Sequence, residues 1–458
     1  MKCVLEHTWQ VGDRVVIVGS NCVTVRSSRV PHELTELKDR VVQRTDGLPA
    51  EAVSADICVV GAGIAGIAAA LEAAKLGRKV VLVDSLPVIG GQCVNSLIGL
   101  FCGVYGNGPE YRQLTHGIFT DIFRDLGRTC DVAFNDRHTR TVNYDEVVLG
   151  RWFEGQVAER GIEVVTNAPL LSAETEDGHI GSATFATRFG LLKVEAQGYI
   201  DASGDASLTW EAGLECRVPE REIWGSQQVR IENLYPRNAP APDVLAAAVG
   251  EHAEDYGLIR KDGLAFFFPG RDSAILNMTH VEAPLEPLAA SRAQLKGREQ
   301  ADLVLQFLRD TFPETFADAT VRQYGFPGRR QTRWIKAQHQ LTTEEVRTGY
   351  EFEDSVARTS WPIELHDRPE GYVWEVFEPD HLHYIPLRSI LPAQTVNLIA
   401  AGRVVDGDAA ALSSVRVMGP CAAMGEAAAH ALDMTLGAAV TDVDVAGLRE
   451  RIAKNVDA

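Results

Sequence analysis

The stretch 56–84, DICVVGAGIAGIAAALEAAKLGRKVVLVD, decides the fold. It opens with a short apolar run of the kind that forms a buried strand, and the glycine-rich turn 61–66 follows directly. An alanine-rich helix then extends to Gly77, and the stretch 79–84, KVVLVD, predicts a second strand. Strand, turn, helix and strand in this order make a βαβ unit, so the sequence predicts an α/β fold with a parallel sheet.

The glycines of the turn have the spacing of a dinucleotide-binding fingerprint. Gly61 permits the tight turn, Gly63 lets a pyrophosphate approach the backbone, and Gly66 lets the helix pack closely on the strand. Asp84 ends the second strand, 84 − 66 = 18 residues after the last glycine. An acid there suits hydrogen bonds from ribose hydroxyls. The turn residues Ile64 and Ala65 and the adjacent Ser85 are included in the expected dinucleotide site.

FAD suits this turn better than NAD, which remains the alternative. Gly90 and Gly91 follow Asp84 by six and seven residues and would let the chain pass close to a flavin. No second GxGxxG follows a strand further along the sequence, so we expect one bound dinucleotide.

Residues 89–103, IGGQCVNSLIGLFCG, begin like the redox-active segment of the pyridine-nucleotide disulfide reductases. On a helix, the nine residues from Cys93 to Cys102 would place the thiols on opposite faces, about 13 Å apart along the axis. A disulfide needs Cα atoms within about 7 Å. The sequence also lacks the NADPH domain and the C-terminal His-Glu pair of those enzymes. We therefore expect no disulfide here; Cys93 either packs against the cofactor or acts as a nucleophile.

The rest of the chain divides by its patterns into two halves of a nucleotide-binding domain around an inserted domain. Residues 13–26 contain two β-runs around a Gly-Ser-Asn turn, and 27–40 predict a short helix. Residues 289–312 predict a long amphipathic helix inside the insertion. The expected parts are an N-terminal hairpin and helix extension at 1–54, the FAD-binding domain at 55–215 and 385–440, an α+β substrate domain at 216–384, and a C-terminal helix or tail at 441–458.

Composition excludes some partners. The net charge is 44 − 63 = −19, which disfavours nucleic acid and anionic lipid. No apolar stretch has the length of a membrane span, and the first residues lack the apolar region of a signal peptide. The eight cysteines show no CxxC pair and no zinc spacing, so we expect no metal site and a cytoplasmic location with reduced thiols.

Over residues 55–436 the chain resembles the FAD-dependent oxidoreductases related to the flavin subunit of heterodisulfide reductase, which share a glutathione-reductase-like fold. The resemblance rests on VIGGQCVNS (88–96), GYIDASGDASL (198–208), YIPLRSILP (384–392) and NLIAAGRVVDGDAAALSSVRVMGPCAAMGEAAA (397–429). The iron–sulfur cysteine motifs of heterodisulfide members are absent from the sequence. The resemblance implies FAD contacts by Gly61, Gly63, Gly66, Asp84, Gly90, Gly91, Gln92, Leu170, Ala202, Gly204, Asp205, Gly402, Arg403, Val417 and Met418.

Catalytic side chains are expected from the inserted domain and the strand that returns from it. In HLHYIPLRS, His381 and His383 share one face of an extended run, and His383 is the best candidate for a base. A structural histidine at a domain boundary is the alternative. Arg330 and Arg333 could clamp a substrate carboxylate or pair with acids between domains. Weaker candidates for the site are Tyr384, Arg388, Asn277, Thr279 and His280.

Together these observations predict an FAD-dependent dehydrogenase or oxidase that transfers a hydride between a small polar molecule and flavin N5. Two alternatives remain: an electron-transfer flavoprotein subunit of a larger complex, and a flavin monooxygenase. The sequence leaves open a homo-oligomer or a partner subunit.

Overall fold

The computed structural model describes residues 5–11, 14–19, 22–27, 39, 41, 50–127, 132–136, 138–268 and 270–457. The chain forms two compact units, residues 1–47 and 48–458. The first contains an antiparallel sheet of β1 (Leu5–Val11), β2 (Arg14–Gly19) and β3 (Cys22–Ser27). The pairing of β2 with β3 confirms the expected hairpin. The short helix expected at 27–40 lies almost entirely outside the described residues.

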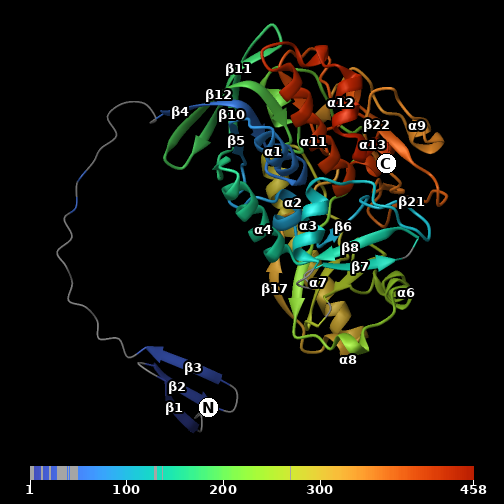
Figure 1. Cartoon of the computed structure of the whole chain (residues 1–458). Helices are drawn as coiled ribbons and strands as arrows, with labels where there is room; N and C mark the ends of the chain where they lie inside the picture. Colours follow the sequence, from blue (N-terminus) through green and yellow to red (C-terminus); the bar gives the residue numbers. More distant parts are fainter. Residues whose placement is uncertain are drawn as a thin grey trace. The chain divides into compact units, whose positions relative to one another are not determined.

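The larger unit is built on a seven-stranded sheet, of which the strands from β4 to β12 are blue to green in Figure 1. Its order is β10-β11-β12-β4-β5-β9, and β23 also pairs with β12. β4, β5, β9, β12 and β23 pair in parallel, whereas β10 and β11 add an antiparallel edge. The bounds are β4 Ala50–Val60, β5 Val80–Val83, β9 Glu163–Val165, β10 Leu170–Glu176, β11 His179–Thr187, β12 Gly190–Asp201 and β23 Leu398–Ala400.

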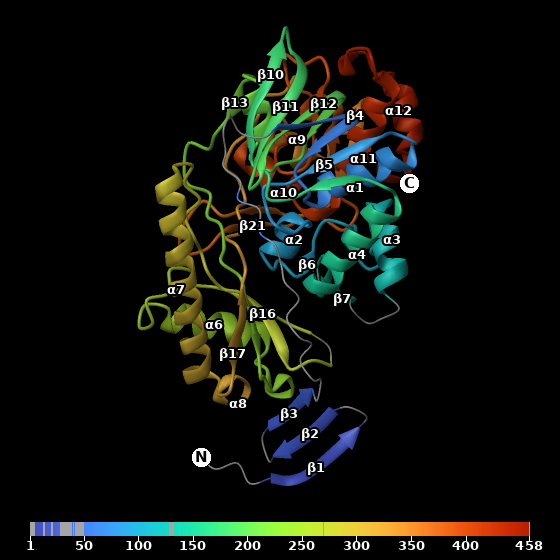
Figure 2. The same ribbon diagram turned by 90° about the vertical axis from the view of Figure 1, so that its left-hand side faces the viewer.

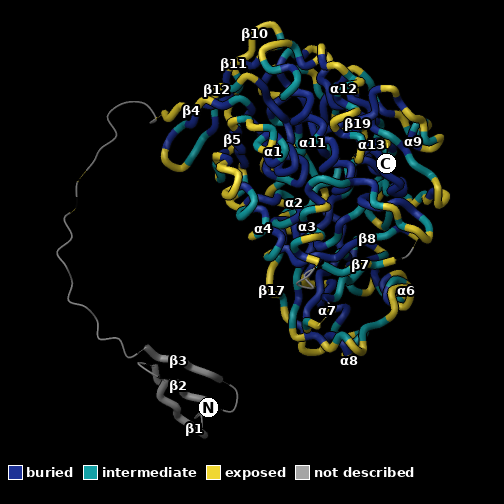
Figure 3. Tube along the Cα trace, viewed as in Figure 1, coloured by how far each residue is buried: buried dark blue, intermediate teal, exposed yellow. Residues whose placement is uncertain are grey.

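The helix predicted after the glycine turn is α1 (Ile64–Lys75), which packs against α11 (Met418–Thr435). Both helices are rich in small residues and lie among the buried parts of the unit (Figure 3). A Cβ on Gly425 of α11 would lie 2.1 Å from the carbonyl oxygen of Ala65, and one on Gly66 would lie 1.8 Å from that of Gly61. The two helices and β4 therefore approach at backbone distance, which only glycine allows at these positions.

A second sheet forms its own hydrophobic core apart from the first, in the part of the chain where we expected an inserted domain. Its antiparallel order is β15-β16-β14-β17. The predicted amphipathic helix is confirmed as α7 (Pro287–Thr311), which runs beside β17 in Figure 2. The other bounds are β14 Val229–Glu232, β15 Leu264–Phe267, β16 Ser273–Asn277, β17 Thr320–Tyr324, the 3-10 helix η1 Pro236–Asn238, α6 Pro242–His252 and α8 Pro313–Phe316.

Shorter elements connect the two sheets and cover their edges. A three-stranded sheet and several ladders join parts that are distant in sequence. These elements are α2 Gly91–Asn95, β6 Leu100–Phe101, α3 Ile118–Leu126, β7 Val132–Asp136, β8 Arg140–Tyr144, α4 Glu146–Glu159, α5 Ser207–Glu211, β13 Cys216–Arg217, β18 Trp334–Ile335, α9 Thr343–Thr348, β19 Ser355–Thr359, β20 Ile363–Leu365, β21 Val373–Glu375, β22 His383–Pro386, η2 Leu387–Ser389, α10 Ala409–Val415, η3 Val440–Asp442, α12 Val445–Arg451 and α13 Ala453–Val456.

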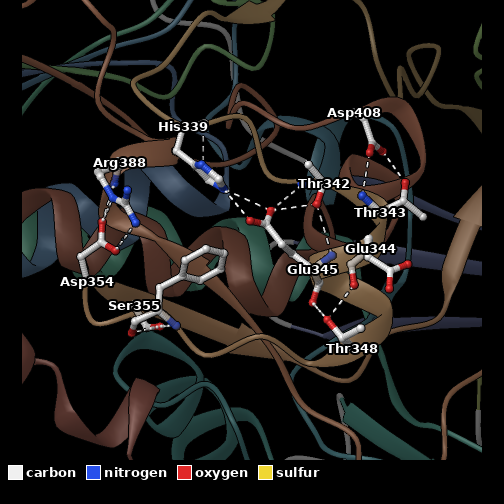
Figure 4. A network of polar contacts seen from close by, with 12 residues as sticks. His339, Thr342, Thr343, Glu344, Glu345, Thr348, Asp354, Ser355, Arg388 and Asp408 are labelled. Carbon is white, nitrogen blue, oxygen red and sulfur yellow. Dashed lines mark hydrogen bonds and ion pairs between the residues drawn. The ribbon is translucent and has the colours of Figure 1, made fainter.

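Polar contacts fix the segment that leads into α11 (Figure 4). Thr342 and Glu345 form a capping box at the start of α9, and Glu345 also contacts His339. Asp408 caps α10 and accepts hydrogen bonds from the backbone and hydroxyl of Thr343, both at 2.6 Å. One carboxylate thus holds the starts of two helices together, and only Arg416 and Val417 separate α10 from α11.

Among the helices in the described ranges, none combines the length and the apolar character that crossing a bilayer requires.

We predict that Gly425→Ala lowers the free energy of unfolding by roughly 1–3 kcal/mol, because the added methyl overlaps the Ala65 carbonyl. Gly155→Ala, on α4, is the matched control: a Cβ there meets nothing within 4 Å. That change is expected to stabilise by about 0.5–1 kcal/mol, since glycine is a poor helix former. Denaturant unfolding of both variants measures this. Equal stabilities of the two variants would contradict the close contact of α1 with α11.

Candidate active site

A cavity of about 1030 Å³ lies where the parallel strands of the main sheet end. Gly61 follows β4, Asp84 follows β5, Ala202 follows β12 and Ala401 follows β23, and all four line the cavity. Because these strands run in parallel, their carboxyl ends meet at one edge of the sheet. Open α/β sheets bind ligands in the crevice beyond this edge. The fold and the cavity thus define a dinucleotide-binding α/β protein.

Most of the residues predicted to contact the cofactor line this cavity. They are Gly61, Gly63, Ile64, Ala65, Asp84, Ser85, Gly91, Gln92, Ala202, Gly204, Asp205, Gly402, Arg403, Val417 and Met418.

The structure places three other predicted contacts, Gly66, Gly90 and Leu170, outside the lining. Gly66 sits in the helix–strand contact, where it fulfils the packing role expected of it. The N–H of Gly90 donates to the Ala62 carbonyl at 2.7 Å, and its φ of 112° is one that glycine favours. Leu170 lies half-buried at the start of β10.

The glycine turn offers a cradle for a pyrophosphate. A Cβ on Gly63 would meet no atom within 4 Å, so the space beside this glycine is open. Gly63 is also the N-cap of α1 and supplies no side chain to the free N–H groups of the first turn. Such N–H groups, together with the helix dipole, favour a bound anion.

Asp84 is held in place beside this turn. Its carboxylate accepts hydrogen bonds from the N–H groups of Ala62, at 2.5 Å, and Leu86, at 2.7 Å. Burial raises the pKa of Asp84, and these two hydrogen bonds act in the opposite direction. The backbone thus orients a carboxylate toward the cavity, where it suits ribose hydroxyls.

Arg403 and the start of α11 add positive electrostatic potential to the cavity lining. Nη1 of Arg403 is buried and has no hydrogen-bond partner, while Nη2 lies 3.5 Å from Asp205. The 18-residue helix α11 begins at Met418, and its N-cap Val417 adds no side-chain hydrogen bond. A free guanidinium N–H and an uncapped helix N-terminus both favour a group that carries negative charge, as a reduced flavin does. The glycine turn, Asp84, Arg403 and the start of α11 therefore fit FAD.

The predicted base lies away from the cavity. His383 is fully buried in β22, with Nε2 2.8 Å from Ser414 Oγ and Nδ1 3.2 Å from His381 Nε2. Burial, with a smaller contribution from His381, lowers the pKa of His383 to about 3. This position argues against catalysis by His383 and favours the alternative of a structural histidine. Tyr384, its neighbour, is also outside the lining.

The two candidate arginines have different surroundings. Arg330 lines the cavity, and its Nη1 donates to the Trp224 carbonyl at 2.6 Å. Arg333 is outside the lining: its Nε donates to the Asp205 carbonyl, and its guanidinium lies 4.6 Å from the Trp210 ring centroid. Of the two arginines predicted to clamp a substrate carboxylate, only Arg330 therefore lines the cavity.

The weaker candidates are also separated. Arg388 pairs with Asp354, with Nε 3.0 Å from the carboxylate, away from the cavity lining (Figure 4). Asn277 lines the cavity. The Thr279 hydroxyl bonds the Gln227 backbone, and His280 is fully buried.

Sequence reasoning missed several lining residues, above all Glu364 and Arg416, which are half-buried. Glu364 is in β20 and shares a face with His366, a spacing that ELH in the sequence could have revealed. Arg416 lies between α10 and α11, and its Nη2 donates to the Glu364 carbonyl at 3.2 Å. Three aromatic side chains complete this wall: Trp361, Tyr372 and Trp374.

Cys93 and Cys102 are both free, as expected. Cys93 lines the cavity but is only 3% exposed, with Sγ 3.5 Å from the Met418 sulfur. Burial raises the pKa of Cys93 to about 12, which favours the packing role over the nucleophile.

Residues 56–452 match the model of the FAD dependent oxidoreductase family. The chain belongs to this family, and FAD is its cofactor.

Curated relatives match over shorter stretches. A dihydrolipoyl dehydrogenase from Manduca sexta is 54% identical over 240 residues, 46% of each chain. A digeranylgeranylglycerophospholipid reductase from Methanoculleus marisnigri is 27% identical over 184 residues, 39% of this chain and 46% of that protein. The chain therefore spans less than half the length of these curated relatives. Among solved structures, a geranylgeranyl bacteriochlorophyll reductase-like protein from Thermoplasma acidophilum aligns at 15% identity and a TM-score of 0.48, covering 88% of this chain and 83% of that one.

We predict that Cys93 resists alkylation in the folded protein at neutral pH. A pKa of about 12 instead of 9 leaves a thiolate fraction roughly a thousandfold smaller than that of a free thiol. Iodoacetamide labelling followed by peptide mass spectrometry measures this, with the denatured protein as the fully labelled control. Rapid labelling of Cys93 in the folded protein would restore the nucleophile hypothesis.

We predict that Gly63→Val leaves the fold intact and weakens FAD binding by at least roughly tenfold. The new side chain extends into the open space beside the turn instead of into the protein. Flavin absorbance after gel filtration reports the bound FAD, and circular dichroism reports the fold. Gly155→Val, at the half-buried α4 glycine where a Cβ meets nothing within 4 Å, is the control that keeps its flavin. Full FAD retention in the Gly63 variant would contradict the assignment of this turn.

Proposed function

We propose that the protein transfers a hydride between flavin N5 and a small organic acid that binds beside Arg330, Arg416 and Glu364. FAD, when bound, supplies two-electron hydride chemistry at N5. The chain supplies orientation, charge and a proton. The proposal rests on one observation: the guanidinium groups of Arg330 and Arg416 line the cavity, and so does the first residue of α11, Met418.

The charges of these arginines favour an anionic substrate. The hydrogen bonds described above direct Arg330 and Arg416 to backbone carbonyls, which accept an N–H without neutralising the charge. Burial lowers the pKa of Arg330 to about 9 and that of Arg416 to about 10, so both stay protonated at neutral pH. Glu364 is a carboxylate that acts on both arginines. A substrate carboxylate would balance the second charge and accept a two-pronged hydrogen bond.

The aromatic side chains around this position would hold the substrate and exclude water. Trp361 donates its indole N–H to Glu364 Oε2 at 3.1 Å and packs edge-on against Trp374, with ring centroids 5.6 Å apart. Tyr372 stacks on His366 at 4.6 Å. Keeping water from the bound molecule would strengthen its electrostatic interactions.

The predicted relation to the heterodisulfide reductase flavin subunit remains a hypothesis, and the motif at 397–429 supports it. One experiment distinguishes the proposed function from the electron-transfer alternative. Purified flavoprotein is mixed under anaerobic conditions with a panel of 2-hydroxy acids and amino acids, and the flavin absorbance is followed. Bleaching by an acid of the panel supports the proposed function. Bleaching only by a reduced protein partner would replace it with the electron-transfer hypothesis.

We predict that Arg330→Met raises the concentration of acid needed for half-maximal bleaching by roughly 10–100-fold. A hydrogen bond to a charged group contributes about 1.5–3 kcal/mol, and each 1.4 kcal/mol corresponds to about a factor of ten. Arg188→Met, at an exposed arginine, is the control and keeps the wild-type dependence. An unchanged concentration dependence in the Arg330 variant would contradict the anion site.

A further inference from the structure

Glu364 is the outer member of a hydrogen-bonded chain that runs from the cavity into the protein. Its Oε1 lies 3.0 Å from His366 Nε2, and His366 Nδ1 lies 2.9 Å from His280 Nε2. His280 Nδ1 in turn lies 2.7 Å from the carbonyl oxygen of Pro369. Both imidazoles are fully buried, whereas Glu364 lines the cavity. The three side chains come from positions up to 86 residues apart.

The carbonyl at the inner end fixes how protons can be arranged. A carbonyl oxygen only accepts, so His280 must carry a hydrogen on Nδ1. If His280 is neutral, its Nε2 accepts and His366 must donate from Nδ1. If His366 is also neutral, its Nε2 then accepts, and it faces an oxygen of Glu364. An ionised Glu364 would leave two acceptors face to face at 3.0 Å.

One additional proton completes the chain of hydrogen bonds. It can reside on the Glu364 carboxyl, on His366 as an imidazolium, or on His280 as an imidazolium. In each arrangement every contact has one donor, and the three side chains together have zero net charge. Without that proton their charge is −1 and one contact is repulsive. Moving along the chain, the proton passes between these arrangements without leaving the protein.

The surroundings shift the pKa of each of the three groups when each is taken by itself. Burial lowers the pKa of His280 to about 2 and that of His366 to about 3. Burial raises the pKa of Glu364, but His366, Arg330 and Arg416 outweigh this effect and lower it to about 2.

Other groups also face the chain. Arg260, which is buried, lowers the pKa of both imidazoles, and Tyr372 stacks on His366. Each of these pKa shifts describes the titration of one group by itself. The hydrogen bonds between Glu364, His366 and His280 instead depend on how protons are distributed over all three groups. The shared proton avoids a buried contact between two acceptors, which is costly because neither group is then hydrogen-bonded.

We propose that Glu364, His366 and His280 hold one shared proton at neutral pH and deliver it to the substrate through the Glu364 carboxyl. This role rests on the proposed function. When a substrate carbon gains a hydride from reduced flavin, the adjacent atom gains the proton from Glu364. The substrate is then reduced by two electrons, the flavin is oxidised, and the three side chains are left with a charge of −1. In the oxidative direction they take the proton back. Glu364 is the catalytic residue; His366 and His280 position it.

Net charge tests the shared proton without flavin turnover or a substrate. In Glu364→Gln the amide donates to His366 Nε2, so it imitates the protonated acid and the charge of the group stays zero. Capillary electrophoresis near neutral pH should therefore give this variant the mobility of the wild type. Glu251→Gln, at an exposed position on α6, is the calibration and should lose one negative charge. A shift of Glu364→Gln equal to that of the control overturns the proposal.

A second variant gives the opposite pattern. In His366→Gln the shared proton has no chain to occupy, so Glu364 ionises and the protein gains one negative charge relative to the wild type. If the wild type instead lacked the proton, this variant would keep the wild-type mobility. Either variant alone decides the question, and circular dichroism shows which of them folds.

Kinetics test the delivery of the proton. With an acid that bleaches the flavin, the wild-type rate should rise with pH, because oxidation requires the chain to have lost its proton. Glu364→Gln should slow bleaching by about 10²–10⁴-fold with little change in half-saturating concentration. His280→Gln should shift the pH at which the rate rises, which a structural role would not do. A pH-independent rate overturns the delivery step. If no acid bleaches the flavin, the proposed function fails while the charge measurement still stands.

Discussion

The arrangement of this protein depends on backbone contacts around the glycine turn. Gly61 can approach β12 because it has no side chain: a Cβ there would lie 2.3 Å from the Ala202 carbonyl. Gly66 and Gly425 permit similar approaches of α1 to β4 and of α11 to α1. Segments that are more than 300 residues apart thus meet at one point. The cavity exists because these contacts hold the ends of four parallel strands and the starts of two helices together.

The sequence predicted those parts of the fold whose signals are local. The βαβ unit and α7 were readable because their apolar periods are strong and continuous. The start of β4 could not be predicted, because the strand begins at Ala50 and not near residue 55. Its first residues, AEAVS, are largely exposed and are held by their pairing with β12. A strand that depends on a partner 141 residues away leaves little pattern of its own.

The site divides in the same way. Cofactor positions such as Gly63 and Asp84 could be predicted because a turn and the end of a strand define them. The wall that we propose for catalysis could not be predicted, because burial and distant partners decide which residues form it. His383 is a candidate base in the sequence because the ordinary pKa of histidine lies near neutrality, yet the fold buries it beside Ser414. Glu364 acquires its character from Arg416 and from His280, whose positions relative to it only the tertiary structure reveals.

Charge links the two proposals made for this wall. With no anion bound, Arg330 and Arg416 favour an ionised Glu364, and this electrostatic pull opposes retention of the shared proton. A substrate carboxylate that neutralises one guanidinium removes part of that pull and so strengthens the hold of Glu364 and His366 on the proton. By linkage, the protonated chain binds the anion more tightly than the ionised chain does. The proton is therefore held most firmly when the molecule that is to receive it is in place, and the charges on the wall bring substrate and proton together.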